Sequence, residues 1–536
     1  MTIYYQGRFL GLSAIFFALL CSCSKPAQSL QSAAPGEQSA DAQTASEQSA
    51  DEPNINEPNI DKPRIDEEDP GIFISVWRTY ASDKPNASSI ELPLVKSGVY
   101  DFKVDWGDGT QDTITRWDAP QKRHRYEEIG GYTVRISGQI QGWSFGSAHL
   151  ENEDRDSAEK TTLGATPEIL EDIYAAHKIS EIKAWGSLKL GNEGRYFMGA
   201  KNLNITATDR PDISETTNFE SGFAGCKTLE KVPGMNDWDV SGVTNMSHLF
   251  DEATSFNQPI GQWDVSSVTD MNNMFSDAGF FNQPLEKWDV SNVTDMSDMF
   301  YSAVHFNQPL EKWDVSNVTN MNSLFTDATS FNQPLEKWDV SNVTDMGGLF
   351  SYAAAFNQPL EKWDVSNVTN MRAIFTRAAA FNQPLEKWDV SSVTDMGDMF
   401  TNATSFNQPL EKWAVSNVTA MNGMFNGAAI FNQPLGRWDV SRVTNMGGMF
   451  LRASAFDQDI STWDISRVTN MRVMLNHSGL STVYYDMLLD AWAQLPVSKS
   501  VPVGVAGLKY SANGTVGRDT LIQKSIGWKF EGDRLE

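Results

Sequence analysis

Residues 281–296 read FNQPLEKWDVSNVTDM, and residues 331–346 repeat the same letters. Phenylalanine, tryptophan and methionine each recur at intervals of 25 residues through this part of the chain. A strict period between about 20 and 50 residues is typical of proteins in which each turn buries its apolar side against the next. The repetition therefore predicts a stack of 25-residue turns over residues 236–476. The tryptophan row is Trp238, Trp263, Trp288, Trp313, Trp338, Trp363, Trp388, Trp413, Trp438 and Trp463.

The segment PLEKWDVS predicts one strand per turn. Leu285, Trp288 and Val290 have the apolar spacing of a leucine-rich-repeat strand, and the last two share a side because they are two residues apart. Parallel strands about 4.8 Å apart would then join the turns. The predicted fold class is an α/β repeat solenoid, leucine-rich-repeat-like, with 25-residue turns and a parallel sheet.

The rest of each turn is predicted to return to the next strand with its apolar side inward. Between Val293 and Phe306 apolar residues recur every three or four positions, which favours a short helical or 3₁₀ path. The tryptophan and methionine rows are expected in the core, the tryptophans because they share a side with the valines. The asparagine of each FNQ, such as Asn282, is expected to bond the backbone of the neighbouring turn.

The outward positions of the predicted strand form repeated polar rows, which are the candidate binding surface. Stacked aspartates repel one another unless something balances them, and the lysine row, bound cations or a ligand would do so. A solvated face whose charges pair with each other is the simpler alternative. The candidate residues are Lys287, Asp289, Ser291, Lys312, Asp314, Ser316, Lys337, Asp339, Ser341, Lys362, Asp364, Ser366, Lys387 and Asp389.

Composition restricts the partners and the chemistry. The net charge of −27 repels phosphate backbones, so nucleic acid is not an expected partner. Of three cysteines only Cys226 lies in the body of the chain, where it takes the place of a buried alanine, and the histidines are scattered singly. We therefore expect no disulfide framework, no metal site and no cofactor.

The regions before and after the repeats differ in composition. Residues 24–70 are rich in Ser, Ala, Gln, Glu, Asp and Pro, which predicts a disordered acidic tether. Residues 71–146 alternate in the manner of short strands and predict a small all-β sandwich. Residues 147–235 are expected to contain degenerate first turns and a cap. Residues 477–536 are expected to form a C-terminal cap. This cap should contain a helix in STVYYDMLLDAWAQLP, a second helix in GRDTLIQKSIG and a strand in WKFEGD.

Two N-terminal features resemble known families. The apolar run from Phe9 to Leu20, followed by Cys21-Ser22-Cys23, resembles a bacterial lipoprotein signal. By this resemblance residues 1–23 are the signal peptide, which ends at the lipidated Cys23. An ordinary secretory signal is the alternative. The stretch VDWGDGT (residues 104–110), with HRY and GGYTVRISG after it, resembles PKD-type immunoglobulin-like domains. In that domain His124 is expected to be structural, and a calcium site in the WGDG turn is a weaker alternative.

The repeated text FNQPL..WDVSNVT.M..MF..A resembles the BspA-like leucine-rich-repeat surface proteins of bacteria. The resemblance implies a secreted or surface-exposed, non-catalytic protein that adheres to an extracellular protein or polysaccharide. It places the chain at the bacterial cell envelope, with a lipid anchor as its only membrane contact. By the sorting rule of lipoproteins, Ser24 and Lys25 after the lipidated cysteine favour the outer membrane surface. A passive envelope spacer is the first alternative, and a polysaccharide-degrading β-helical enzyme the second, which would need a distinct pair of carboxylates.

Overall fold

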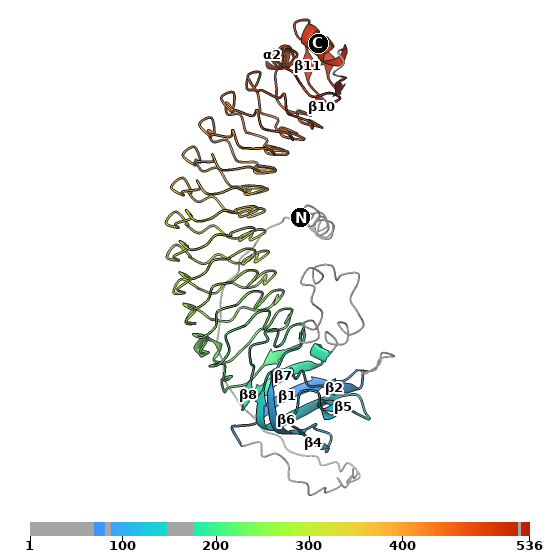
Figure 1. Ribbon diagram of the computed structural model, residues 1–536, viewed down its shortest axis with the longest axis vertical. Coiled ribbons are helices and arrows are strands. Elements are labelled where there is room, and N and C mark those ends of the chain that lie inside the picture. The colour runs from blue at the N-terminus through green and yellow to red at the C-terminus, as the bar shows by residue number, and fades with distance from the viewer. Residues whose placement is uncertain (1–68, 81–86, 147–174, 524–526) are drawn as a thin grey trace, which may run out of the picture. The chain divides into compact units, whose positions relative to one another are not determined.

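A computed structural model describes residues 69–80, 87–146, 175–523 and 527–536. The predicted signal peptide, Cys23 and nearly all of the predicted tether therefore lie outside the described residues. The described chain begins with a β-rich region, continues as stacked turns and ends in a small region that contains the two longest helices (Figure 1).

The β-rich region contains one large sheet and one two-stranded sheet. The large sheet has the order β4-β3-β6-β1-β7-β9, with β8 also paired to β6, and the small sheet pairs β2 with β5. Strands β1, β3 and β6 lie where alternating apolar residues predict them, and their inward side chains form a core that includes Trp77 and Trp143. The strands are β1 (Phe73–Arg78), β2 (Ser89–Glu91), β3 (Val99–Asp105), β4 (Gln111–Ile114), β5 (Arg123–Arg125), β6 (Gly131–Gln141), β7 (Ile179–Ala184), β8 (Leu188–Lys189) and β9 (Asn204–Ile205).

The large sheet continues across the boundary expected at residue 146. Strand β7 pairs antiparallel with β1, with Ser75 opposite Ile182, and β9 pairs parallel with β7. The backbone N–H of Trp143 also donates to the carbonyl oxygen of Leu190. The first turns are thus joined to the β-rich region by backbone hydrogen bonds.

From residue 218 to residue 470 the chain forms stacked turns, which we call the repeat stack. Isolated parallel bridges join residues 25 apart from Asn245 to Asn470, for example Asp270 to Asp295 and Asp295 to Asn320. Figure 1 shows these turns following one another as coils, from green to brown along the chain. Each 25-residue repeat of the sequence is therefore one turn of the stack.

Backbone hydrogen bonds join neighbouring turns in one segment, which we call the ladder (residues 294–302 and their equivalents). The N–H groups of Met296, Asp298, Phe300 and Ser302 donate to carbonyl oxygens 24 residues later, at 2.7–3.1 Å. The alternate N–H groups turn back within their own turn, as Met299 does to the carbonyl of Met296. The ladder thus ties the turns together and closes each turn on itself.

The strand predicted in PLEKWDVS does not form, because this segment folds into two tight turns. Trp288 N–H donates to the Leu285 carbonyl at 3.1 Å, and Ser291 N–H donates to Asp289 Oδ1 at 3.1 Å. Equivalent tryptophan rings of neighbouring turns lie 6.4–6.5 Å apart, wider than the spacing of about 4.8 Å between paired strands. The backbone hydrogen bonds between turns thus lie in the ladder and not in the segment that contains the tryptophan.

The helical return path predicted between Val293 and Phe306 is also wrong. Two residues per turn adopt left-handed backbone conformations, such as Asp298 (φ 55°) and Ser302 (φ 53°), and these interrupt a helix after a single turn. Their amides then face the next turn instead of continuing a helix. Glycine occupies several of the equivalent positions, among them Gly348, Gly423 and Gly427.

The core rows lie where the sequence predicts them. All ten tryptophans of the row are at most 4 % exposed, and the equivalents of Val293, Met296 and Phe306 are fully buried. Each indole from Trp263 onward donates from Nε1 to the carbonyl 28 residues earlier, at 2.8–3.0 Å. Cys226 is buried, as expected for a residue in an alanine position.

The asparagine ladder is confirmed. Asn282 Oδ1 accepts hydrogen bonds from the N–H of Asn307 at 3.0 Å and from Nε2 of Gln308 at 2.9 Å, and the pattern repeats up to Asn432. Asp457 takes the last position of this ladder and accepts the N–H of Ser481, the residue before the C-terminal helix. The same acceptor that joins turn to turn therefore also joins the stack to its cap.

The C-terminal region confirms the two predicted helices and the strand. Helix α2 covers Thr482–Trp492, α3 covers Thr515–Gln523 and strand β12 covers Lys529–Glu531. Short parallel pairs join β10 to β12 and β11 to β13. The remaining strands are β10 (Pro502–Gly504), β11 (Lys509–Tyr510) and β13 (Arg534–Leu535).

An ion pair lies in the core of this cap. The Arg518 guanidinium donates two hydrogen bonds to Asp533, at 2.7 and 2.8 Å, and Tyr485 donates its hydroxyl to the same carboxylate at 2.9 Å. Burial, together with Asp533, raises the pKa of Tyr485. The cap also extends the ladder, because Leu475 N–H donates to the carbonyl of Gly504.

Candidate functional site

The predicted aspartate row is exposed, and its carboxylates bind their own turn. Asp289 Oδ1 accepts the backbone N–H of Ser291, and the pairs Asp314–Ser316, Asp339–Ser341, Asp364–Ser366 and Asp389–Ser391 repeat this bond at 3.0–3.1 Å. Hydrogen bonds from Ser316 hold the pKa of Asp314 below its ordinary value, and Ser366 does the same for Asp364. Each aspartate thus has a structural role in a tight turn.

Four lysines of the predicted row pair with glutamates and not with aspartates, so balancing by lysine, one of the alternatives for the aspartate row, is not seen at these positions. Each of four lysines reaches the glutamate of the turn before it, with Nζ–O distances of 3.0–3.2 Å. The pairs are Lys337–Glu311, Lys362–Glu336, Lys387–Glu361 and Lys412–Glu386. The geometry explains this choice, because the glutamate one position before lysine faces the next turn, whereas the aspartate is already held by serine. Within the part of the chain that the structure describes, Lys287 and Lys312 have no such ion pair.

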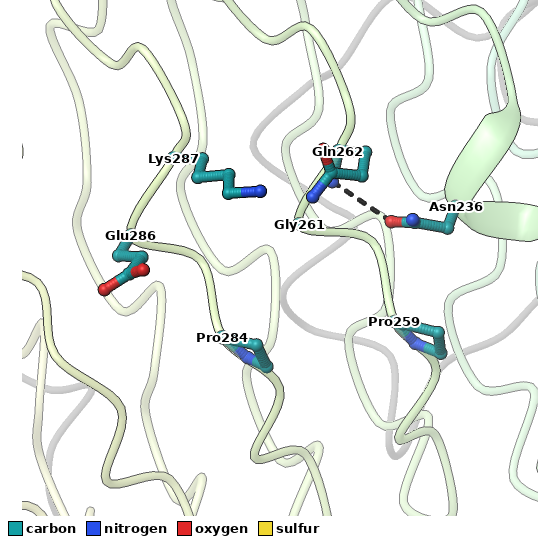
Figure 2. A pocket seen from close by; sticks show the side chains of 7 residues that line it. All are labelled: Asn236, Pro259, Gly261, Gln262, Pro284, Glu286 and Lys287. Carbon is teal, nitrogen blue, oxygen red and sulfur yellow. Dashed lines mark hydrogen bonds between the residues drawn. The ribbon is translucent and has the colours of Figure 1, made fainter.

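Lys287 instead borders a hollow at the start of the uniform repeats. Asn236, Pro259, Gly261, Gln262, Pro284, Glu286 and Lys287 line it. Figure 2 shows the Lys287 ammonium pointing toward Gly261 and Gln262 and the Glu286 carboxylate pointing away. The hollow exists because Gly261 and Gln262 replace the Glu-Lys pair of later turns, and Lys287 loses its glutamate for the same reason.

Another polar surface lies along the ladder, formed by its outward side chains; we call it the ladder face. At the bridge position aspartate and asparagine alternate: Asp295, Asn320, Asp345, Asn370 and Asp395. Asp345 Oδ1 accepts from Gly347 N–H at 2.8 Å and from the amides of Asn370 and Asn322 at 2.9 and 3.2 Å. Alternation places an amide donor between carboxylates, so these side chains bond to each other without repulsion between neighbours.

Two carboxylates on this face have pKa values above the ordinary range. Burial raises the pKa of Asp327, with a further contribution from Asp277 two turns away. Burial also raises the pKa of Asp398, although Arg372 bonds to it and opposes the effect. These two aspartates are half-buried, whereas Asp289 and Asp314 of the aspartate row are exposed.

The WGDG turn near the N-terminus is closed by its own side chains. Asp105 accepts the N–H of Gly107 at 2.9 Å, and Asp108 accepts the N–H of Thr110 at 3.0 Å. His124 contacts Asp108 through Nε2 at 2.7 Å and stacks on Trp106, with ring centroids 4.8 Å apart. His124 is therefore a structural residue, as predicted, and both aspartates are already used as turn acceptors.

Neither a metal site nor a membrane span stands out in the described parts of the chain. No group of three or more histidine, cysteine, aspartate or glutamate side chains there could hold a metal ion. None of the helices in residues 69–80, 87–146, 175–523 and 527–536 is long and apolar enough to cross a bilayer.

The repeat stack matches a family described as "Mycoplasma protein of unknown function, DUF285". Three overlapping matches cover residues 192–310, 305–408 and 374–483, which together span more than half of the chain. The protein belongs to the DUF285 family. Its periodic phenylalanine and tryptophan rows agree with the resemblance to BspA-like repeat proteins. No curated protein matches the chain.

The repeat pattern of this DUF285 protein hides the residues at which single turns differ. Phe280 and His305 stand at the last position of their turns, where the equivalent residues are mostly serine or alanine. Phe280 is 60 % exposed and stacks on His305. The departure of these two residues from the repeated text is the signal in the sequence, and it lies outside the repeated polar rows.

Proposed function

We propose that this protein is a lipid-anchored bacterial surface protein whose repeat stack acts as a non-catalytic adhesion or ligand-binding module. In this proposal the stack is a solenoid of the leucine-rich-repeat type, and the β-rich region before it is a PKD-like domain. The partner is an extracellular protein or polysaccharide. Two kinds of position within each turn support the proposal. The residues that repeat from turn to turn are buried or hydrogen-bonded, whereas the outward residues of the ladder face vary.

The observation that carries the proposal is the fixed presentation of side chains along the stack. Indoles, asparagines and alternate backbone amides bond from one turn to the next, so outward groups are held at a regular spacing. A surface ordered before binding loses less conformational entropy when it meets a partner. Such a surface suits adhesion through many weak, repeated contacts.

Adhesion is best tested with chains shortened by whole turns. Bacteria that display the full chain, and bacteria that display a chain lacking residues 256–355, would be compared for binding to matrix proteins and polysaccharides. We expect adhesion to fall at least tenfold in the shortened chain while both ends remain folded by circular dichroism. Equal adhesion by two equally displayed chains would contradict the proposal.

The anchoring part of the proposal depends on Cys23, outside the described residues. Metabolic labelling with a palmitate analogue is expected to label the chain and to fail for Cys23→Ser, with Cys21→Ser as the matched control. Protease added to intact cells should then degrade the wild-type chain, which would place it on the outer surface. Full labelling of Cys23→Ser would contradict the anchor.

A passive envelope spacer is the second candidate, and one observation favours it. The aspartates of the candidate binding surface, and its lysines Lys337, Lys362 and Lys387, already bond within the chain. Charge reversal at Lys287 and Lys312, which have no such ion pair in the described chain, distinguishes the two. Reduced adhesion supports a binding surface, whereas unchanged adhesion to every partner favours the spacer.

A further inference from the structure

One aromatic pair interrupts the row of small residues at the end of each turn. The row begins with Ser255, Phe280, His305 and Ser330, and later contains mostly alanine and serine. Phe280 is 60 % exposed although the other phenylalanines of the repeat are fully buried. An exposed ring of this size in a polar row has no role in the core.

The pair is held rigidly. The rings of Phe280 and His305 are nearly parallel, with centroids 5.2 Å apart and an angle of 11° between the planes. His305 Nδ1 lies 2.7 Å from the carbonyl oxygen of Gly279, which can only accept, so Nδ1 carries the hydrogen. The backbone N–H of His305 donates to the same carbonyl. The platform is therefore ordered before any ligand arrives.

Serines flank the pair on both sides along the stack. Ser255 is the equivalent residue one turn before Phe280, and Ser330 is the equivalent residue one turn after His305. Both side chains are small and carry a hydroxyl that can donate and accept. Because equivalent residues follow one another along the stack, we expect Ser255 beside the outer face of Phe280 and Ser330 beside the outer face of His305, and a serine is small enough to leave space for a flat group there.

We propose that Phe280, supported by His305, is a sugar-binding platform for neutral or amino-sugar glycans. The C–H face of a pyranose ring would lie on the phenyl face, whose electron density attracts the positive edge of C–H bonds. The Ser255 hydroxyl, one turn before Phe280, would bond the rim of sugar hydroxyls. The proposal rests on the proposed binding function and names its ligand class and its position.

The surroundings favour a sugar over an apolar peptide and over an acidic glycan. An apolar peptide needs a continuous apolar groove, whereas serines border this platform along its own row, and in the neighbouring row Gly279 and Val304 lie between Thr254 and Thr329. A sugar ring has one apolar face and a polar rim, which matches that border. The net charge of −27 disfavours sulfated or uronic-acid polymers.

The test is a glycan array probed with the full chain, followed by titration calorimetry with the oligosaccharide that binds best. We expect neutral or amino-sugar ligands, at least tenfold weaker binding by Phe280→Ala, and retained binding by Phe280→Trp. Ile430→Ala is the matched control, because Ile430 occupies the same row and is 48 % exposed; its affinity should not change. Circular dichroism of all three variants confirms that they are folded.

Three results would overturn the inference. These are binding of no glycan, a preference for acidic polymers, and an affinity that Phe280→Ala leaves unchanged. Binding of an aromatic peptide with the same mutational pattern would replace the sugar by a protein partner. If Phe280→Ala cells still adhere while chains shortened by whole turns do not, the platform fails and the proposed adhesion function stands.

Discussion

The indole Nε1 of Trp313 donates a hydrogen bond to the carbonyl oxygen of Leu285, at 3.0 Å and 28 residues earlier. Trp238, at the start of the row, has a buried Nε1 with no hydrogen-bond partner in the described part of the chain. The two indoles are almost equally buried, at 3 % and 4 % exposure. They therefore allow the hydrogen bond to be separated from the burial of the ring.

We expect Trp313→Phe to lower the free energy of unfolding by about 1 kcal/mol more than Trp238→Phe does. Both changes remove similar apolar area, but only the first removes a hydrogen bond between turns. Urea denaturation of the two variants measures the difference. Equal losses would show that the indole hydrogen bond adds nothing to stability.

The asparagine ladder predicts different effects for two substitutions at one position. Asn332 Oδ1 accepts from the N–H of Asn357 at 2.9 Å and from Nε2 of Gln358 at 3.0 Å. Asn332→Ala should cost about 2–3 kcal/mol, because both donors lose their acceptor. Asn332→Asp keeps an acceptor, as Asp457 does at the end of the ladder, so its loss in urea denaturation should be clearly smaller. Similar losses would contradict this role for the side-chain oxygen.

Stacking of equivalent turns predicts that the chain tolerates deletion of one whole repeat. Removal of residues 331–355 joins Ser330 to Phe356 and restores the same sequence register, so we expect a folded chain with a smaller m-value. Removal of residues 331–342 breaks the tryptophan and asparagine rows and should cause misfolding. Circular dichroism and urea denaturation distinguish the two, and equal behaviour would contradict the register argument.

Two aspartates should respond to pH in opposite directions. Hydrogen bonds to Ser316 lower the pKa of Asp314 in the folded state, so its stabilising effect is present at neutral pH and is lost as the pH falls through the lowered pKa. Burial raises the pKa of Asp327, so ionisation destabilises the folded state as the pH rises through the raised value.

Accordingly, Asp314→Asn should lower the melting temperature at pH 7. The corresponding loss in the free energy of unfolding should be only a few tenths of a kcal/mol, because the carboxylate is exposed. Asp327→Asn should raise the melting temperature at pH 7. Both effects should shrink as the pH falls, the effect at Asp327 first because its pKa is raised, and the effect at Asp314 only at lower pH because its pKa is lowered. Thermal melts across this pH range test the signs, and a stabilising Asp314→Asn would contradict the assignment.

The sequence was sufficient for the turns and for their core. Fixed intervals between Trp288 and Trp313, and between Asn282 and Asn307, identify groups that must meet in neighbouring turns, and both rows do so. These fixed intervals did not show which segment of each turn forms the backbone ladder. Trp288 and Val290 alternate as in a strand, yet the Asp289 side chain captures the Ser291 amide and turns the chain.

The left-handed residues show why local sequence was a poor guide to the return path. Aspartate and serine, as at Asp298 and Ser302, indicate a positive φ much less strongly than glycine does. Val473 adopts φ 50° at an equivalent position despite its branched side chain. Bonds to the next turn impose these conformations, so they depend on contacts between repeats. Four lysines pair with glutamate and not with aspartate for a similar reason, because the glutamate that each lysine contacts belongs to the preceding turn.

If the chain is anchored near its N-terminus, as we propose, the ladder determines how it responds to a pulling force. Tension on the C-terminus would detach one coil at a time, since every coil is bonded only to its two neighbours. Each detachment would release 25 residues, or roughly 80–90 Å of extended polypeptide. Single-molecule stretching should then record a sawtooth of evenly spaced, similar force peaks. Such a molecule would lengthen stepwise under flow and absorb a sudden pull before any bond to its surroundings has to break.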